Sequence, residues 1–226
     1  MINSKKMPAI DDLRYPLFWP ESDTGTYGFY NNNKDHNSGP VGDWMSSHRY
    51  IIDAIPQNKR RTCVQAGGAM GLYPVLLASR FDLVVTFEPY WPSFNYLKAN
   101  CANEMKWNVE AHNKALGEIR RSNVNMIVPS QQNLGMNRVD TSYTGNGSVD
   151  MIELDSLCLK EVDLIWFDLE GHEYKALLGS MQTIKATKPI IGIERPSNDV
   201  YEFLKKLGYE RENAKKSAMD VFFYPS

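Results

Sequence analysis

The hydrophobic pattern between Arg61 and Glu88 is the most informative stretch of the chain. An apolar run over residues 63–66 meets the turn GGAMG at 67–71, a helical pattern follows, and a second apolar run over 83–87 ends on Glu88. This succession is typical of half of a nucleotide-binding βαβ unit. Glycines allow a tight reversal after the strand and let a ligand approach the backbone N–H groups.

Strand and helix patterns alternate along most of the chain. One apolar stripe at helical spacing runs from Val41 to Ile52, and the nearly unbroken apolar run within Val162–Gly171 is typical of a parallel strand buried on both faces. One helix is expected directly after that strand, with its apolar stripe running from Tyr174 to Met181. The other expected elements are a helix from Phe94 to about Met105, strands over Asn108–Asn113, Asn123–Val128 and Pro189–Glu194, a helix over Asn198–Leu207, and two extended pieces between Tyr209 and Tyr224. The alternation predicts a doubly wound, Rossmann-like α/β fold with a mostly parallel sheet and helices on both faces.

Two stretches lack a periodic pattern. Residues 1–40 are rich in turn-forming and aromatic residues and are expected to form an irregular N-terminal cover. Residues 131–148 are polar and rich in Gly and Asn, which favours a functional lid, with disorder as the alternative. We expect residues 1–60, the cover and its leading helix, to belong to the same domain as the ligand-binding body at 61–226.

Composition sets the class of protein. With 226 residues, 42% of them hydrophobic, the chain suits one well-buried domain. A net charge of -2 gives no electrostatic reason to expect a nucleic-acid partner. The three widely spaced cysteines indicate a reducing compartment, and no run approaches the roughly 20 apolar residues of a membrane span. We therefore expect a cytoplasmic protein without a membrane partner, whose oligomeric state the sequence leaves open.

The spacing of the glycines distinguishes a dinucleotide-binding loop from one that binds S-adenosylmethionine. A dinucleotide fingerprint requires glycines at the first, third and sixth places, and neither Gly67 nor Gly68 starts such a series. The turn instead reads G-x-x-x-G from Gly67 to Gly71, the form usual in S-adenosylmethionine-binding sheets. An acid that closes the second strand, here Glu88, can accept both hydroxyls of a ribose.

Several blocks together resemble the FkbM-type methyltransferases. In chain order they are VQAGGAMGLYPVLLA, TFEPYWPSFNYLKANC, NKALG, IELDSL, DLIWFDLEGHEYKALLG and PIIGIE, and the resemblance covers about residues 61–207. It implies a seven-stranded S-adenosylmethionine-dependent sheet and O-methylation of a hydroxyl on a sugar, a glycan or a small natural product. The family usually begins its glycine loop as D-V-G-A-N-x-G, whereas this chain has Gln65 at the acid and Ala69 at the asparagine.

The resemblance also implies roles for particular residues. The methionine end of the cofactor would lie along Gly67, Gly68 and Gly71, and Glu88 would accept from the ribose hydroxyls. Three further residues would lie near the adenine ring: Tyr90, which follows the ribose acid, and Lys114 and Ala115 at the end of the third strand. Packing is the alternative for Tyr90.

Asp168, Glu170 and His172 end the fourth strand beside the expected position of the transferable methyl group. Methyl transfer from a sulfonium is an in-line displacement, so alignment is the main task, and a base that takes the hydroxyl proton adds roughly 10²–10⁴ in rate. His172 or Asp168 would be that base. Alternatively, His172 is a helix-start residue that faces solvent and Glu170 an acid that complements the helix dipole.

Together with Glu173 these residues also have the side-chain types of a metal site. His172 and Glu173 are adjacent at a helix start and point apart, so we predict no metal. The leading hypothesis is an S-adenosylmethionine-dependent methyltransferase. A non-catalytic binding or scaffold domain, motivated by Gln65, is the alternative, and a nicotinamide dehydrogenase, which lacks the third-place glycine, is a third.

Overall fold

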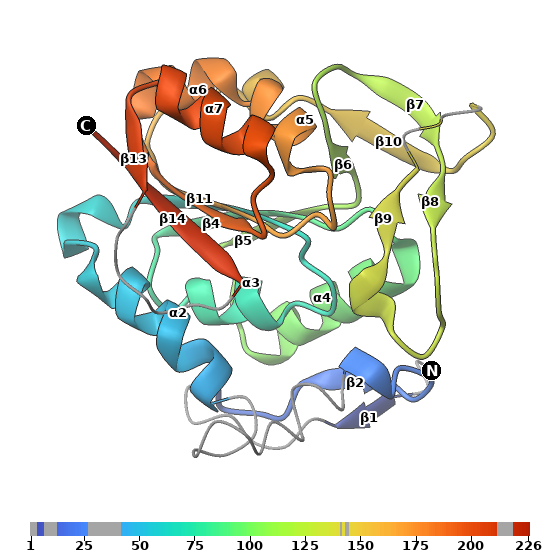
Figure 1. The fold of residues 1–226 in the computed structure, drawn as a ribbon. Coiled ribbons are helices and arrows are strands. Elements are labelled where there is room, and N and C mark those ends of the chain that lie inside the picture. Colours follow the sequence, from blue (N-terminus) through green and yellow to red (C-terminus); the bar gives the residue numbers. More distant parts are fainter. Residues whose placement is uncertain (1–3, 7–12, 27–41, 141, 143–144, 212–218) are drawn as a thin grey trace.

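A twisted sheet of seven strands forms the centre of the computed structural model (Figure 1). The model describes residues 4–6, 13–26, 42–140, 142, 145–211 and 219–226. The strands are, in spatial order, β13 (Tyr209–Arg211), β14 (Asp220–Pro225), β12 (Ile190–Glu194), β11 (Val162–Phe167), β3 (Thr62–Ala66), β4 (Leu83–Phe87) and β5 (Val109–His112). The last five run parallel, and β14 is antiparallel to both of its neighbours. This confirms the predicted mostly parallel α/β sheet.

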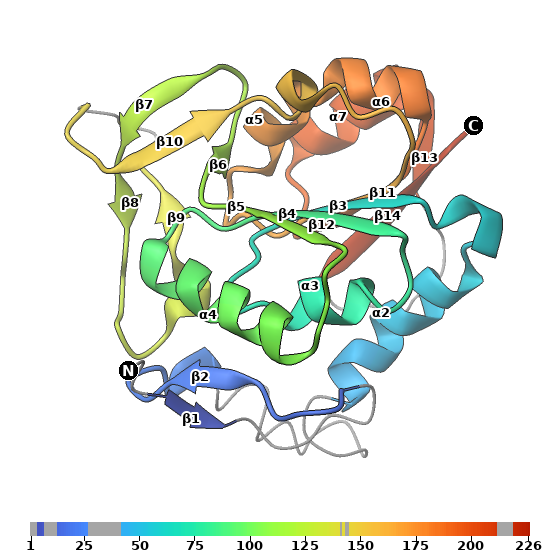
Figure 2. The ribbon, with the colours of Figure 1, turned by 180° about the vertical axis from the view of Figure 1, so that it is seen from behind.

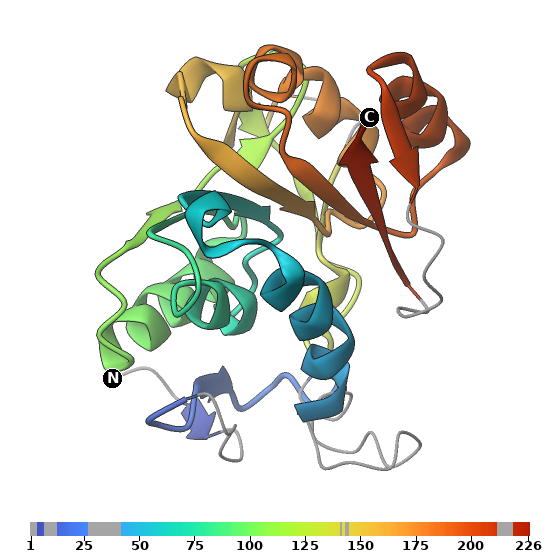
Figure 3. The same ribbon diagram turned by 90° about the vertical axis from the view of Figure 1, so that its left-hand side faces the viewer.

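Helices cover both faces of the sheet. They are α2 (Gly42–Ala54), α3 (Leu72–Leu77) and α4 (Trp91–Asn103) on one face, and α5 (Glu173–Leu178), α6 (Met181–Thr187) and α7 (Asn198–Lys206) on the other (Figures 1 and 2). The side view keeps the two groups on opposite sides of the strands (Figure 3). Each face has its own apolar core, because strands such as β3 and β11 are buried on both sides.

Smaller sheets extend the domain at one edge. The order β6-β10-β7 joins Ala115–Leu116, Val149–Ile152 and Arg121–Val124, and β8 (Met126–Ile127) pairs with β9 (Arg138–Val139). The extended segment predicted over Asn123–Val128 is therefore divided between two sheets. The stretch at 131–148, expected to be without regular structure, contains the 3-10 turn Leu134–Met136 and strand β9.

The N-terminal segment is more regular than expected. Strand β1 (Ser4–Lys6) pairs with β2 (Phe18–Pro20), and the pair lies beyond the α2–α4 layer, on the side away from the sheet (Figures 1 and 2). The Asn100 side chain on α4 fixes β2, because it donates to Phe18 O and accepts from Phe18 N. Residues 1–3, 7–12 and 27–40 of the predicted cover lie outside the described residues, as do the side chains of Trp44 and Met45 on the predicted leading helix.

A helix, α5, follows β11 as predicted, but its continuation to Met181 is wrong, because the chain breaks at Gly179 and Ser180 and Met181 begins α6. Gly179 packs so closely on Gly117 that an added Cβ would overlap the Gly117 carbonyl. The Asp155 carboxylate then accepts from the backbone N–H groups of residues 182 and 183 and so caps the start of α6. Neither partner is near in sequence, so local periodicity gives no sign of the break.

Strand order places a ligand site at the centre of the sheet. β3 and β11 are neighbours, but the chain leaves β3 toward β4 on one side and β11 toward β12 on the other. In doubly wound sheets the crevice beyond the carboxyl ends of such strands binds ligands. No helix within the described residues is long and apolar enough to cross a membrane.

Candidate functional site

The glycine loop after β3 is held closely against the neighbouring strands. The N–H groups of Gly67 and Gly68 both donate to the Phe87 carbonyl, at 3.1 and 2.9 Å. Gly67 has φ +85°, and a Cβ there would overlap the Asp168 carbonyl oxygen. Gly71, at φ +91°, would bring a Cβ to 3.0 Å from Leu97 Cα. These positions require glycine because of their backbone angles and because other chain segments pack against them.

Glu88 lies at the carboxyl end of β4 and is buried. Its carboxylate accepts from Ala69 N and from Tyr90 N, both at 2.8 Å, and so connects the glycine loop to the start of α4. Burial raises the pKa of Glu88 to about 7, against the opposing effect of the two hydrogen bonds. The carboxyl therefore changes its charge near neutral pH.

Gln65, the departure from the family pattern, lies inside the protein. Its Nε2 donates to Gly67 O at 3.0 Å and to Ala66 O at 3.3 Å, while its Oε1 accepts from Thr86 Oγ1 at 2.7 Å. The side chain lines none of the hollows described below. The amide therefore stabilises the glycine loop by hydrogen bonds and does not face a hollow.

Two adjoining hollows open at the carboxyl ends of β3, β4 and β11. The first hollow encloses about 400 Å³, its open mouth included, and is lined by Gly67, Phe87, Glu88, Pro89, Lys114, Ala115, Leu116, Met126, Asn137, Arg138, Val139, Asp168, Leu169 and His172. The second hollow encloses about 580 Å³ and is lined by Trp19, Thr26, Gly67, Gly68, Ala69, Met70, Leu72, Tyr73, Glu88, Leu134, Gly135, Asn137, Asp168 and Glu170. The two share Gly67, Glu88, Asn137 and Asp168.

Most of the predicted cofactor residues line these hollows. Lys114 and Ala115 border the first one. Tyr90 lies outside both, in a third hollow with Trp91 and Asn113, although its backbone N–H holds Glu88. Of the predicted glycines, Gly71 also lies outside both, since it faces α4.

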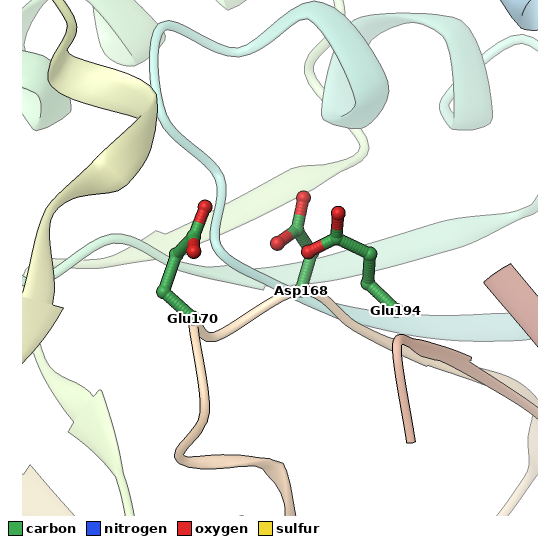
Figure 4. A group of neighbouring side chains, drawn as sticks. All are labelled: Asp168, Glu170 and Glu194. Atoms are coloured by element: carbon green, nitrogen blue, oxygen red, sulfur yellow. The ribbon is translucent and has the colours of Figure 1, made fainter. Parts of the chain in front are cut away.

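Three carboxylates gather beside the second hollow. Oxygen atoms of Asp168, Glu170 and Glu194 all lie within 4.8 Å of one another (Figure 4). Burial, and then the charge of Glu194 and a hydrogen bond with it, raise the pKa of Asp168 well above its ordinary range. Burial and Glu194 also raise the pKa of Glu170, whose backbone is in the left-handed region at φ +52°. Like charges so close together favour proton retention.

The cluster differs in membership from the predicted one. Glu194 ends β12, next to β11, and is not among the predicted site residues, although an acid after the buried strand IIGI was an available signal. Glu173 is instead turned onto its own loop, where Oε1 accepts from Leu169 N and Gly171 N. His172 does not join the group. Carboxylate oxygens are donors that hard cations accept, but the described chain adds no His, Cys, Asp or Glu ligand to these three.

His172 directly precedes α5 and is buried, with 4% of its surface exposed. The alternative that it faces solvent is therefore wrong. Neither ring nitrogen has a hydrogen-bond partner in the part of the chain that the structure describes. Burial lowers the pKa of His172 to about 4, with a further contribution from Lys175, so the imidazole is neutral at pH 7.

His48, on α2, contacts residues of two strands of the sheet. Its Nε2 lies 2.7 Å from Asp220 Oδ2, and the other oxygen of Asp220 accepts from Trp166 Nε1 at 3.1 Å. The ring centroids of His48 and Trp166 are 4.8 Å apart. These contacts connect α2 with β14 and β11.

The fold is similar to those of solved methyltransferases. The FkbM methyltransferase from Methylobacillus flagellatus KT aligns over 74% of this chain and 44% of its own length, with 18% identity and a TM-score of 0.52. A candidate rRNA-methylase from Clostridium thermocellum aligns over 81% of this chain and 96% of its own length, with 14% identity and a TM-score of 0.51. At these identities the likeness concerns the fold. The chain thus spans less than half of the length of the Methylobacillus protein.

Sequence comparison gives the family. No curated protein matches the chain. The model of the methyltransferase FkbM domain matches residues 74–211, more than half of the sequence, and the matched part includes Glu88, Asp168 and Glu194. This confirms the resemblance noted in the sequence. The chain belongs to the FkbM family of S-adenosylmethionine-dependent methyltransferases.

Proposed function

We propose that this chain transfers the methyl group of S-adenosylmethionine to a hydroxyl of a sugar, a glycan or a small natural product. The observation that carries the proposal is the meeting of two hollows at Glu88 and Asp168. Glu88, the acid assigned to the ribose, borders both hollows, and Asp168 and Glu170 of the carboxylate cluster line the second one. A donor nucleoside and an acceptor would thereby meet at one edge of the sheet.

The residues present fit the cofactor. Glu88 borders both hollows and offers carboxylate oxygens to ribose hydroxyls, while Gly67 and Gly68 leave the loop backbone without side chains. His172 and Asn137 contribute buried polar atoms for which the described ranges of the chain supply no hydrogen-bond partner. A nucleoside offers hydroxyls, donors and acceptors that match these groups.

The chemistry that remains for the protein is alignment and removal of one proton. S-adenosylmethionine, when bound, supplies a sulfonium methyl group that is open to in-line displacement. Asp168 takes the hydroxyl proton as the acceptor oxygen bonds to the methyl carbon and the carbon–sulfur bond breaks. Burial, and then Glu194, raise the pKa of Asp168, so that its ionised form is a stronger base than an ordinary carboxylate.

Acceptor selection is assigned to the walls of the second hollow. Trp19 comes from the N-terminal segment and Leu134 from the stretch at 131–148. The two segments are tied together, because Asp23 accepts from Leu134 N and Thr26 Oγ1 accepts from Gly135 N. Aromatic walls and carboxylates are suited to the apolar faces and hydroxyls of a sugar.

Calorimetric titration with S-adenosylhomocysteine tests the cofactor site. We expect binding, and absence of binding at millimolar ligand would reject the proposal. A Glu88→Ala variant should bind much more weakly, because it loses the acceptor for the ribose hydroxyls. Glu202→Ala, at an exposed position on α7, serves as the control. Equal affinities for wild type and Glu88→Ala would show that the ribose assignment is wrong.

Acceptor screening separates the enzyme from its alternative. The chain would be incubated with methyl-labelled S-adenosylmethionine and a panel of glycosides and hydroxylated natural products, and labelled products counted. Product formation that disappears in Asp168→Asn supports the proposal. Binding of S-adenosylhomocysteine without product across the panel would favour a non-catalytic binding domain, and preferential binding of NAD would favour the dehydrogenase.

A further inference from the structure

Two buried polar side chains in the first hollow lack partners. Both ring nitrogens of His172, and both the oxygen and the nitrogen of the Asn137 amide, are buried and have no hydrogen-bond partner among the described residues. Both residues line the first hollow, Asn137 at its border with the second. A buried polar group that makes no hydrogen bond costs about 1–3 kcal/mol, so native proteins rarely keep one without a reason. A ligand that supplies the missing partners is such a reason.

The chemistry of the hollow describes that ligand. Apolar side chains make up much of the wall, among them Leu116, Met126 and Val139. A neutral imidazole offers one donor and one acceptor, and an amide offers two donors and one acceptor. A flat, uncharged heteroaromatic ring has apolar faces for such walls and both donors and acceptors on its edge. Adenine has this combination, with an amino donor and ring-nitrogen acceptors.

We propose that His172 and Asn137 hydrogen-bond the edge of the adenine ring and thereby select the base of the cofactor. The inference rests on the proposed function, because Glu88 at the junction of the two hollows would fix the ribose. The carboxylate cluster, where the methyl group would be transferred, lies beside the second hollow. The adenine ring would therefore extend into the first hollow. His172 is then a cofactor-specificity residue, and proton removal is left to Asp168.

Base-modified ligands test the proposal by calorimetry. S-inosylhomocysteine replaces the amino donor of adenine by a carbonyl and the N1 acceptor by an N–H donor. Wild type should bind S-adenosylhomocysteine at least about tenfold more tightly than this analogue, since mismatched edges leave buried groups unpaired. His172→Phe and Asn137→Leu should each lose about tenfold in affinity for S-adenosylhomocysteine and most of the preference between the ligands.

A matched control isolates the effect. The Tyr209 hydroxyl is also buried and has no partner within the described chain, but it belongs to the core that contains Val200 and Leu204 of α7 and lines neither hollow. Tyr209→Phe should keep wild-type affinity and preference. If His172→Phe and Asn137→Leu also keep both while wild type binds, the inference is overturned and the proposed function stands. Absence of binding by wild type would overturn both.

Nuclear magnetic resonance of the wild-type imidazoles covers the case in which a variant does not fold. The chain has four histidines. On addition of S-adenosylhomocysteine the ring signals of His172 should shift, because a hydrogen bond fixes its tautomer. Signals of His48, which is engaged with Asp220 outside the hollow, should stay in place. Unshifted His172 signals at saturating ligand would contradict the assignment.

Discussion

Replacing Glu88 with glutamine should stabilise the ligand-free protein at alkaline pH while it weakens cofactor binding. The carboxyl is 7% exposed, and burial raises its pKa from an ordinary 4.5 to about 7. The folded protein therefore holds this proton more tightly than the unfolded chain does. Folding stability from this group is fully present below about pH 4.5 and is lost as the pH rises through 7.

The magnitude follows from the two pKa values. Their difference, 7 minus 4.5, at ~1.4 kcal/mol for each pH unit, corresponds to a loss of about 3 kcal/mol, most of it between pH 5 and pH 8. Glutamine does not ionise and escapes this loss. Its single oxygen retains one of the hydrogen bonds from Ala69 N and Tyr90 N, and the missing bond costs about 1 kcal/mol at every pH. The stability difference between Glu88→Gln and wild type should thus move in favour of the variant by about 2–3 kcal/mol from pH 5 to pH 8.

Urea unfolding followed by tryptophan fluorescence at four pH values measures this difference. Other titrating groups are common to both proteins, so their contributions cancel unless they are coupled to Glu88. Glu202→Gln removes an exposed carboxylate on α7 and should stay within about 0.5 kcal/mol of wild type throughout. A Glu88→Gln difference that does not change with pH would refute the account of a buried, proton-retaining carboxyl.

Three further substitutions test separate parts of the site. Gly67→Ala should lower the free energy of unfolding by about 3 kcal/mol or more, since its Cβ would overlap the Asp168 carbonyl. The control Gly171→Ala, also at positive φ but with open space around it, should cost about 1 kcal/mol. Equal shifts in the thermal melting temperature of the two variants would contradict this. Asp168→Asn should raise stability at pH 8 by relieving the cluster, and a lower urea midpoint would contradict the repulsion. Asp23→Ala should cost about 1–3 kcal/mol and speed proteolysis near Leu134, whose N–H loses its acceptor; unchanged proteolysis would show that the tie is unimportant.

Sequence patterns predicted the central sheet because a buried strand is visible in the sequence as a local run of apolar residues. The mainly apolar runs that became β3, β4, β11 and β12 are short and bounded by turn residues, and the structure confirms each strand. No local sequence pattern of this kind indicates the break between α5 and α6. It depends on Asp155 and Gly117, which reach Gly179 and its neighbours only in the folded chain.

The residues of the site likewise fall into those that local sequence indicates and those that only the fold brings together. Gly67 and Glu88 are recognisable because their spacing within one βαβ unit carries the signal. Trp19 and Asn137 reach the second hollow from stretches with no periodicity, so nothing in their neighbours indicates that they meet there. Glu194 had a signal, an acid after a buried strand, but only strand order places it beside Asp168.

Gln65 shows why a departure from a family pattern has to be judged in three dimensions. In sequence, an amide in place of an acid suggests a weakened cofactor site. In the fold the side chain lies behind the loop, where Nε2 donates to Gly67 O and Oε1 accepts from Thr86. A carboxylate could accept the Thr86 hydroxyl but could not donate to the Gly67 carbonyl, and it would be buried there without a cation. The amide is thus compatible with the loop conformation that positions Gly67 and Gly68.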